Sequence, residues 1–328
     1  MPKSETIESL GENESLRRTI SRLNLSESAL VGPGDDAAVV ASPDGRFVVT
    51  TDTMVEGHDF RRDWSSSYDL GYKAIATNVA DVAAMGAVPT ALVVALIVPK
   101  QTEITWLEAF ADGLREACQT LAPKASVVGG DLASGSQIVI AVTAHGDLEG
   151  RTPVLRSGAQ VGDIVAVAGT LGRAACGLSL LSGENVNARN AYDDWVNVQL
   201  RPNPPIQAGV DASLAGATSM LDISDGLAKD ANRIAKASGV TINIRSADLI
   251  GYEAVLEGAA QALEVNPRDW VLFGGEDHSL LATFPADVQL PKAFKAIGEV
   301  VALQNDQYLM LDRQPLVAKG WDSVISLN

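Results

Sequence analysis

Residues 31–40, VGPGDDAAVV, combine glycines with two adjacent carboxylates. The glycines and Ala37 fit the G-x-G-x-x-A spacing of a dinucleotide-binding turn, whose backbone N–H groups approach a pyrophosphate. Such a turn needs a strand before it and a helix after it, whereas residues 25–30 are polar and mixed and the residues after Asp36 predict a strand. Asp35 and Asp36 instead suit a hard cation such as Mg²⁺, which takes carboxylate and phosphate oxygens. A turn with solvated carboxylates is an equal alternative for this motif alone.

Other aspartates recur at the ends of apolar runs or within a small-residue helix: Asp52, Asp81, Asp131, Asp222 and Asp225. An isolated buried charge is costly, so carboxylates in such places need metals or other partners. For each one alone a helix cap or turn role is as well supported as a ligand role, but together they favour a site for divalent cations.

Several neighbouring groups suit phosphate. Thr50, Thr51 and Ser224 offer hydroxyls beside the aspartates. Arg156 is either a bidentate phosphate clamp or a surface arginine. Glu276, in the segment GGED, either lies on a sharp turn at a pocket or belongs to a plain connection between a helix and a strand.

The sequence contains no P-loop, protein-kinase, zinc-protease or nucleophile-elbow motif. His58, His145 and His278 are scattered without ligand spacing, which favours satisfied or exposed histidines over catalysts. Any phosphate chemistry would therefore proceed without a P-loop and without a histidine base.

Composition excludes several classes of function. The 328 residues carry 25 Lys and Arg against 41 Asp and Glu, a net charge of −16, which argues against a nucleic-acid-binding protein. Two distant cysteines, Cys118 and Cys176, support neither a disulfide framework nor a thiolate metal site and fit a reducing cytoplasm. The N-terminal residues lack the apolar core of a signal peptide, and the longest apolar run is too short to span a bilayer. We expect a soluble, cytoplasmic protein without membrane partners.

Apolar periodicity predicts mixed helices and strands in both halves, without a strict βαβ repeat. In the first half we expect a helix over about 4–23, a hairpin around the turn at 43–45, a helix over 65–86, a buried strand over 91–98, a helix over 102–121, and strands in 125–135 and 137–148. Residues 148–160 mark a boundary. In the second half we expect a strand and a turn before a helix from 162, a strand, turn and helix over 219–239, and a helix, turn and strand over 267–285.

Seven segments occur in an order and spacing that resemble those of the thiamine-monophosphate kinases, within the superfamily of aminoimidazole ribonucleotide synthetase. They are GPGDDAAVV, TTDTMVEGHDF, NVADVAAMGAVPTALVVAL, VVGGDLASG, RSGAQVGD, DISDGLAKD and FGGEDHSLL. The resemblance implies an α+β protein with the two-domain synthetase-like fold. Residues 1–148 would form an N-terminal α/β domain that binds ATP and Mg²⁺ and dimerises, and residues 149–328 a C-terminal α+β domain that completes the nucleotide and substrate site.

The same resemblance implies roles for individual residues. The metal ligands would be Asp36, Thr50, Thr51, Asp52, Asp81, Asp131, Asp222 and Asp225. The ATP contacts would be Gly130, Asp131, Arg156 and Ser224, and Glu276 and Trp321 would contact the thiamine end. Many members carry a substrate-contacting His directly before the Phe of the GHDF segment. Here Asp59 precedes Phe60 and His58 lies one place earlier, so the sequence leaves that role open between Asp59 and His58.

The implied activity is ATP-dependent phosphorylation of thiamine monophosphate by direct in-line transfer, assisted by several Mg²⁺ ions, in a homodimer. A phosphate monoester is mostly dianionic at neutral pH, so it needs no general base, and no acid–base residue is expected. Two alternatives remain: a synthetase or cyclo-ligase of the same superfamily, and a non-catalytic protein that binds divalent cations or nucleotides.

Overall fold

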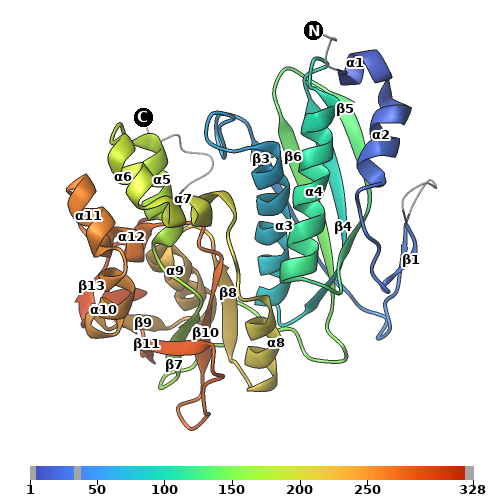
Figure 1. Ribbon diagram of the computed structural model, residues 1–328. Coiled ribbons are helices and arrows are strands. Elements are labelled where there is room, and N and C mark those ends of the chain that lie inside the picture. Colours follow the sequence, from blue (N-terminus) through green and yellow to red (C-terminus); the bar gives the residue numbers. More distant parts are fainter. Residues whose placement is uncertain (1–4, 33–37, 322–328) are drawn as a thin grey trace. The chain divides into compact units, whose positions relative to one another are not determined.

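The computed structural model describes residues 5–32 and 38–321 and divides into two compact units (Figure 1). Unit 1 comprises Met1–Val82 and Val88–Gly150, and unit 2 comprises Ala83–Ala87 and Arg151–Asn328. Each unit has its own sheet. In the part of the chain that the model describes, every helix is too short or too polar to cross a membrane.

Unit 1 is built on a four-stranded sheet with the order β3-β6-β4-β5. Its strands are β3 (Val48–Val55), β4 (Val88–Val98), β5 (Ser126–Ser134) and β6 (Val139–Asp147). The β4–β5 pair is parallel and the other pairs are antiparallel. Two long helices, α3 (Ser67–Ala84) and α4 (Ile104–Leu121), run along one face (Figure 1). These strands and helices agree with the predicted elements.

The face of this sheet opposite α3 and α4 is partly exposed, as the side chains of β4 show. Val94 and Leu96 are buried, whereas Val93 and Ile97 are each 36% exposed. The prediction of a buried strand over 91–98 is therefore right about the strand and wrong about its burial. Helices cover only one side, so alternate residues of β4 remain uncovered.

Two predictions for the N-terminal region are wrong in detail. The single helix over 4–23 is divided into α1 (Ile7–Leu10) and α2 (Glu12–Ile20), because the chain passes through Gly11 with a φ of 77°. The predicted hairpin does not form: β2 (Val39–Val40) pairs with β1 (Ala29–Val31), and β3 pairs along its whole length with β6. The turn before β3 exists, with Gly45 N donating to Ser42 O, but the two-residue β2 offers too little backbone to hold the eight residues of β3.

Unit 2 is built on a seven-stranded sheet with the order β13-β12-β9-β11-β7-β10-β8. All pairs are antiparallel except β9–β12. The strands are β7 (Ile164–Ala168), β8 (Ser219–Ile223), β9 (Thr241–Ile244), β10 (Ser279–Phe284), β11 (Phe294–Val301), β12 (Leu309–Leu311) and β13 (Gln314–Pro315). The helices are α5 (Arg173–Ser182), α6 (Val186–Ala191), α7 (Asp193–Leu200), α8 (Ile206–Leu214), α9 (Leu227–Ser238), α10 (Ser246–Ala254), α11 (Glu257–Leu263) and α12 (Pro267–Phe273).

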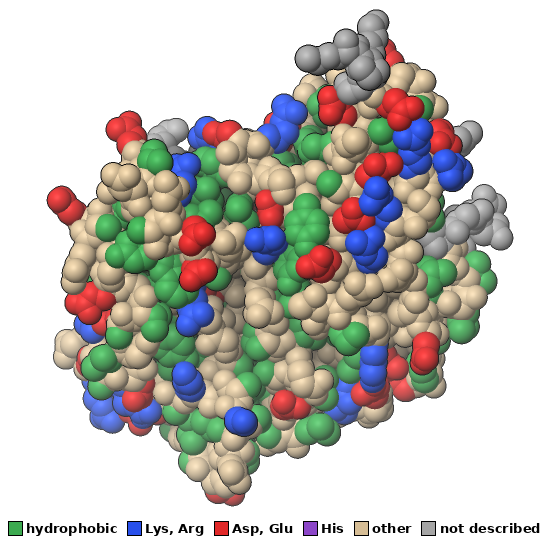
Figure 2. Space-filling model, viewed as in Figure 1, with side chains coloured by type: hydrophobic (Ala, Val, Ile, Leu, Met, Phe, Trp, Pro, Cys, Tyr) green, Lys and Arg blue, Asp and Glu red, His purple; other side chains and the backbone are tan. Residues whose placement is uncertain are grey.

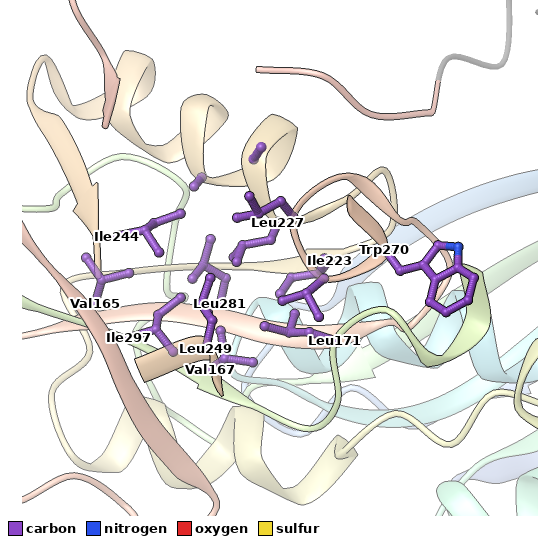
Figure 3. Packing of buried hydrophobic residues seen from close by; sticks show 14 of the residues in the cluster. Val165, Val167, Leu171, Ile223, Leu227, Ile244, Leu249, Trp270, Leu281 and Ile297 are labelled. Carbon is purple, nitrogen blue, oxygen red and sulfur yellow. The ribbon is translucent and has the colours of Figure 1, made fainter. Parts of the chain in front are cut away.

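The central strands of unit 2 are buried on both faces. Val165 and Val167 of β7 belong to one core cluster, and Ala166 and Ala168 belong to another. Figure 3 shows the first cluster, in which side chains of β7, β8, β9, β10 and β11 meet those of α9, α10 and α12. A strand held in this way has little freedom to shift its register. The residues at the ends of these strands therefore have fixed positions.

Candidate functional site

Three of the predicted site residues lie at the end of β8 and in the turn after it. Asp222 lies on β8, and Ser224 and Asp225 follow it in the turn that leads into α9. The fully buried Asp230 holds this turn: its Oδ2 accepts the N–H of Asp225 at 3.0 Å and that of Gly226 at 3.1 Å. Gly226 has a φ of 117°, which favours glycine. Backbone geometry and a buried carboxylate together fix the direction of the turn.

Opposite charges surround the acids of this turn. Asp225 forms ion pairs with Lys229, at 3.0 Å, and with Arg233. Arg233 also contacts Asp230 Oδ1 at 2.5 Å. Burial raises the pKa of Asp230 to about 7, against the opposing effect of Arg233. Arg233 and Lys229 thus offset the negative charge that gathers at this end of β8.

The GGED segment lies directly beside the same turn. Glu276 N donates to Ser224 O at 2.8 Å, and His278 N donates to Ile223 O at 3.0 Å. A Cβ atom on Gly275 would lie 2.4 Å from Ser224 O, so only glycine permits this approach. Glu276 and His278 both have positive φ values, 65° and 48°, and such strained conformations gather at functional sites. The segment is a sharp turn against the acids of β8 and not a plain connection.

Asp277 anchors this segment to the start of α5. Its buried carboxylate accepts the N–H of Gly172 at 2.6 Å, that of Arg173 at 3.1 Å and the hydroxyl of Thr170 at 3.0 Å. Burial raises the pKa of Asp277 to about 6. The neighbouring His278 is also buried, with Nδ1 3.2 Å from Asp222 Oδ2. This contact gives the Nδ1 atom of His278 a partner and places the side chain beside a proposed ligand, Asp222.

Trp321 joins the same cluster from the far end of the chain. The backbone N–H of Trp321 donates to Asp225 O at 2.9 Å, and its backbone carbonyl oxygen accepts a hydrogen bond from Lys229 Nζ. Five predicted site residues of unit 2 are therefore brought together at the end of β8: Asp222, Ser224, Asp225, Glu276 and Trp321.

In unit 1 a hydrogen bond joins two of the predicted ligands. Thr50 Oγ1, on β3, donates to Asp81 Oδ2, on α3, at 2.9 Å. The neighbouring Thr51 hydroxyl donates to Val142 O at 2.9 Å, across the sheet. Asp52, also on β3, is exposed. Unit 1 thus presents acidic and hydroxyl oxygens at β3 and α3.

A second part of unit 1 carries two of the predicted ATP contacts, Gly130 and Asp131. Asp131, on β5, is exposed, and a Cβ atom on Gly130 would lie 2.1 Å from Val94 O, so only glycine fits between the parallel strands. Gly130 and Asp131 line a cavity of about 1110 Å³ together with many apolar side chains. A cavity of this size is large enough for a nucleotide-sized ligand.

The remaining predicted residues are not brought into these groups. Asp36 lies outside the described residues. Arg156 is exposed, and its carbonyl oxygen accepts a hydrogen bond from the hydroxyl of Ser238. His58 is exposed, whereas Asp59 Oδ2 accepts the N–H of Val55 at 2.7 Å and so holds the end of β3. Which of the two contacts substrate stays open.

Within residues 5–32 and 38–321, no group of three or more His, Cys, Asp or Glu side chains is arranged to hold a metal ion. The complete predicted metal set includes Asp36 and draws on both units. It stays a prediction.

The surface over α2 and α4 is of a different kind. Figure 2 shows acidic and basic side chains interspersed there, and Arg22 bridges Glu108 at 3.3 Å and Asp112 at 2.6 Å. These carboxylates are paired with arginines at the surface, which is an ordinary arrangement of small energetic value. They are not candidates for a phosphate or metal site.

Comparisons with known proteins agree with the predicted resemblance. Residues 34–148 match the family described as AIR synthase related protein, N-terminal domain. The chain is 42% identical to the thiamine-monophosphate kinase of Mycobacterium tuberculosis, over 98% of this chain and 94% of that protein. It is 38% identical to that of Corynebacterium glutamicum, over 97% and 95%. A solved structure, AaThiL complexed with AMPPCP and TMP, is 34% identical with a TM-score of 0.76 and covers 93% of this chain and 94% of that one.

Proposed function

Since the chain belongs to the thiamine-monophosphate kinase family, we propose that it transfers the γ-phosphate of ATP to thiamine monophosphate. The products are thiamine diphosphate and ADP. The observation that carries the proposal is the cluster at the end of β8, where Asp222, Ser224 and Asp225 lie beside Glu276 and Trp321. The AaThiL structure with AMPPCP and TMP supports it, because that relative binds an ATP analogue and TMP.

The residues present fit Mg²⁺. Carboxylate and hydroxyl oxygens are the donors that this ion prefers, and the contact between Thr50 and Asp81 places two of them together. We propose that Asp52, Asp81 and Asp131 of unit 1 and Asp222 and Asp225 of unit 2 hold several such ions, with the remaining ligands Asp36, Thr50 and Thr51. When bound, Mg²⁺ neutralises phosphate charge and aligns the reacting groups for in-line transfer.

The chain's own groups then position the two substrates. The turn held by Asp230 carries Ser224 and Asp225, and Asp222 lies near the end of β8 just before it. We assign ATP contacts to Ser224 and to Gly130, Asp131 and Arg156. The acceptor phosphate carries its own negative charge and attacks without a base, so no residue is assigned as a general acid or base.

Glu276 and Trp321 suit recognition of the thiamine end. The thiazolium ring is positively charged, so a carboxylate attracts it and the face of an indole ring adds a cation–π attraction of about 1 kcal/mol. Both residues are fixed to the turn after β8 by backbone hydrogen bonds. The substrate would thus be oriented by groups on the same support as two of the proposed metal ligands, Asp222 and Asp225.

We also propose a homodimer that works in the cytoplasm. The face of the unit 1 sheet opposite α3 and α4 exposes the apolar side chains of Val93 and Ile97, and a second copy would remove them from water. Light scattering after size-exclusion chromatography tests this: a mass near 69 kDa, twice 34.3 kDa, supports the dimer, and 34.3 kDa contradicts it.

The activity is tested by incubating the purified chain with Mg²⁺, ATP and thiamine monophosphate and separating the products. Thiamine diphosphate and ADP in equal amounts are expected. Formation of a cyclised product from formylglycinamidine ribonucleotide, without thiamine diphosphate, would identify a synthetase of the same superfamily instead. Nucleotide binding without any ADP formation would identify a non-catalytic protein.

A further inference from the structure

A buried amide on α7 contacts the proposed substrate residue Glu276. Gln199 is 6% exposed, and its Nε2 donates a hydrogen bond to Glu276 Oε2. Its Oε1 has no hydrogen-bond partner among the residues that the structure describes. A glutamine buried only to stabilise a helix packing would have both ends of its amide satisfied. In the described part of the chain, the bond to Glu276 is the one hydrogen bond that the Gln199 side chain makes.

The position of Gln199 is fixed by the packing of α7 on α5, which lie side by side (Figure 1). A Cβ atom on Gly177 of α5 would lie 2.1 Å from Trp195 O and 2.8 Å from Gln199 Cβ. The Arg173 guanidinium also lies over the Trp195 ring, 5.1 Å from its centroid. A close contact through glycine leaves α7 little freedom to slide, so the amide reaches Glu276 from a rigid helix.

The other partner is fixed as well. Glu276 has a φ of 65°, its N–H is bonded to Ser224 O, and the next residue, Asp277, is tied to the start of α5. Gln199 is therefore held by the packing of α7 on α5, and Glu276 is held by the bonds that tie its segment to the start of α5. A carboxylate held by an amide N–H on such a support points in one direction, which is what recognition of a ring requires.

We propose that Gln199 is a specificity-determining positioning residue that orients the Glu276 carboxylate toward the cationic ring of the acceptor substrate. The proposal rests on the proposed function and extends it to the discrimination between a charged and a neutral ring. Gln199 itself acts through Glu276. Its loss should weaken recognition of the positive charge and leave ATP binding and folding unchanged.

The test compares thiamine monophosphate with an analogue in which a neutral ring replaces the thiazolium. Gln199→Leu and Gln199→Met keep the side-chain volume and remove the N–H donor. We expect the wild type to prefer the charged substrate in kcat/KM. In both variants this preference should fall about tenfold through the KM for thiamine monophosphate, as loss of a hydrogen bond to a charged group implies, with the KM for ATP unchanged. Asn197→Leu, an amide lost from the same helix, should leave the preference unchanged.

Two results would overturn the proposal. The first is an equal loss of kcat/KM for both substrates, since a merely structural role changes both alike. The second is an unchanged preference in a folded Gln199→Met protein. If the wild type forms no thiamine diphosphate, the proposed activity fails. Calorimetric binding of thiamine monophosphate then decides the role of Gln199 alone: a weaker affinity in Gln199→Leu supports it, and an equal affinity contradicts it.

Discussion

Asp230 is the residue whose replacement tests the architecture of the site most sharply. Both backbone donors of the turn, the N–H groups of Asp225 and Gly226, point at the same oxygen, Oδ2. Asp230→Asn keeps one carbonyl oxygen that can occupy this place, whereas Asp230→Ala removes the acceptor altogether. The two variants separate the hydrogen bonds to the turn from the charge of the side chain.

The expected magnitudes follow from these contacts. A buried donor left without a partner costs about 1–3 kcal/mol. Asp230→Ala leaves two of them, so the free energy of unfolding should fall by about 2–5 kcal/mol. Asp230→Asn keeps an acceptor for both bonds; it loses the contact with Arg233, which is itself 36% exposed, but also removes a charge that burial disfavours, so we expect a change of less than about 1 kcal/mol.

Urea unfolding at pH 7, followed by circular dichroism, measures these differences. Asp211→Ala, on α8, is the control, because its carboxylate accepts only an exposed hydrogen bond from Gln207, and it should change stability by less than about 0.5 kcal/mol. Equal destabilisation by Asn and Ala, or a loss below 1 kcal/mol for Ala, would refute the assignment of Asp230 as the support of the turn.

We also expect the stability of the wild type, relative to that of Asp230→Asn, to depend on pH. Because burial raises the pKa of Asp230 from 3.8 to about 7, the folded protein binds a proton that the unfolded protein has released. The stability contributed by this proton is lost as the pH rises through about 7. The free energy of unfolding of the wild type, relative to Asp230→Asn, should therefore fall by about 1.4 kcal/mol between pH 6 and pH 8. A constant difference would show that Asp230 does not titrate between pH 6 and pH 8 and would contradict the prediction.

Two further predictions concern burial and packing. Burial raises the pKa of Cys118 and of Cys176 to about 12, so a thiol reagent at pH 8 should label neither in the native protein and both in urea; rapid native labelling would contradict this. Gly113→Ala should lower the free energy of unfolding by about 1–3 kcal/mol, because its Cβ would lie 2.1 Å from Tyr68 O. Gly251→Ala, on α10, is the control: its Cβ would meet nothing within 4 Å, so this variant should not be destabilised. A melting temperature for Gly113→Ala equal to that of Gly251→Ala would show that the contact between α3 and α4 relaxes.

Local pattern predicted the turn after β8 well. An apolar run, a glycine and a periodic helix over 219–239 predict strand, turn and helix, and the structure has β8 and α9 there. The sequence places Asp222, Ser224 and Asp225 at the end of this strand and in the turn after it, and their roles as ligands stay predictions. These features depend on neighbours in the sequence, which is why the sequence shows them.

The meeting of Glu276 and Trp321 with this turn was not predictable from local pattern. It depends on the pairing of Ser279 with Ile223, which joins β10 to β8, and on the bond from Trp321 N to Asp225 O. Only the family resemblance grouped these residues in advance. The supporting residues were missed for the same reason. Asp230 lies in the first turn of the helix after β8, but nothing in the sequence shows which N–H groups a buried side chain accepts.

The wrong predictions also concern long-range pairing. A turn between two apolar runs predicts a hairpin, but β3 finds a longer partner in β6. The apolar run of β4 predicts burial on both faces, yet helices cover one face only. In both cases the local pattern correctly predicts a strand, but what pairs with that strand or covers it is decided by segments far away in the chain.

The initial rate of thiamine diphosphate formation by Asp52→Asn, at saturating ATP and thiamine monophosphate, tests the central claim that acidic side chains serve the transfer by holding cations. Asp52 is exposed on β3, whose backbone pairs fully with β6, so the variant should fold with a nearly unchanged melting temperature, as should the surface control Asp63→Asn. We predict that kcat falls by a factor on the order of 10² or more in Asp52→Asn and stays near the wild-type value in Asp63→Asn. Near-normal turnover by folded Asp52→Asn would contradict the account.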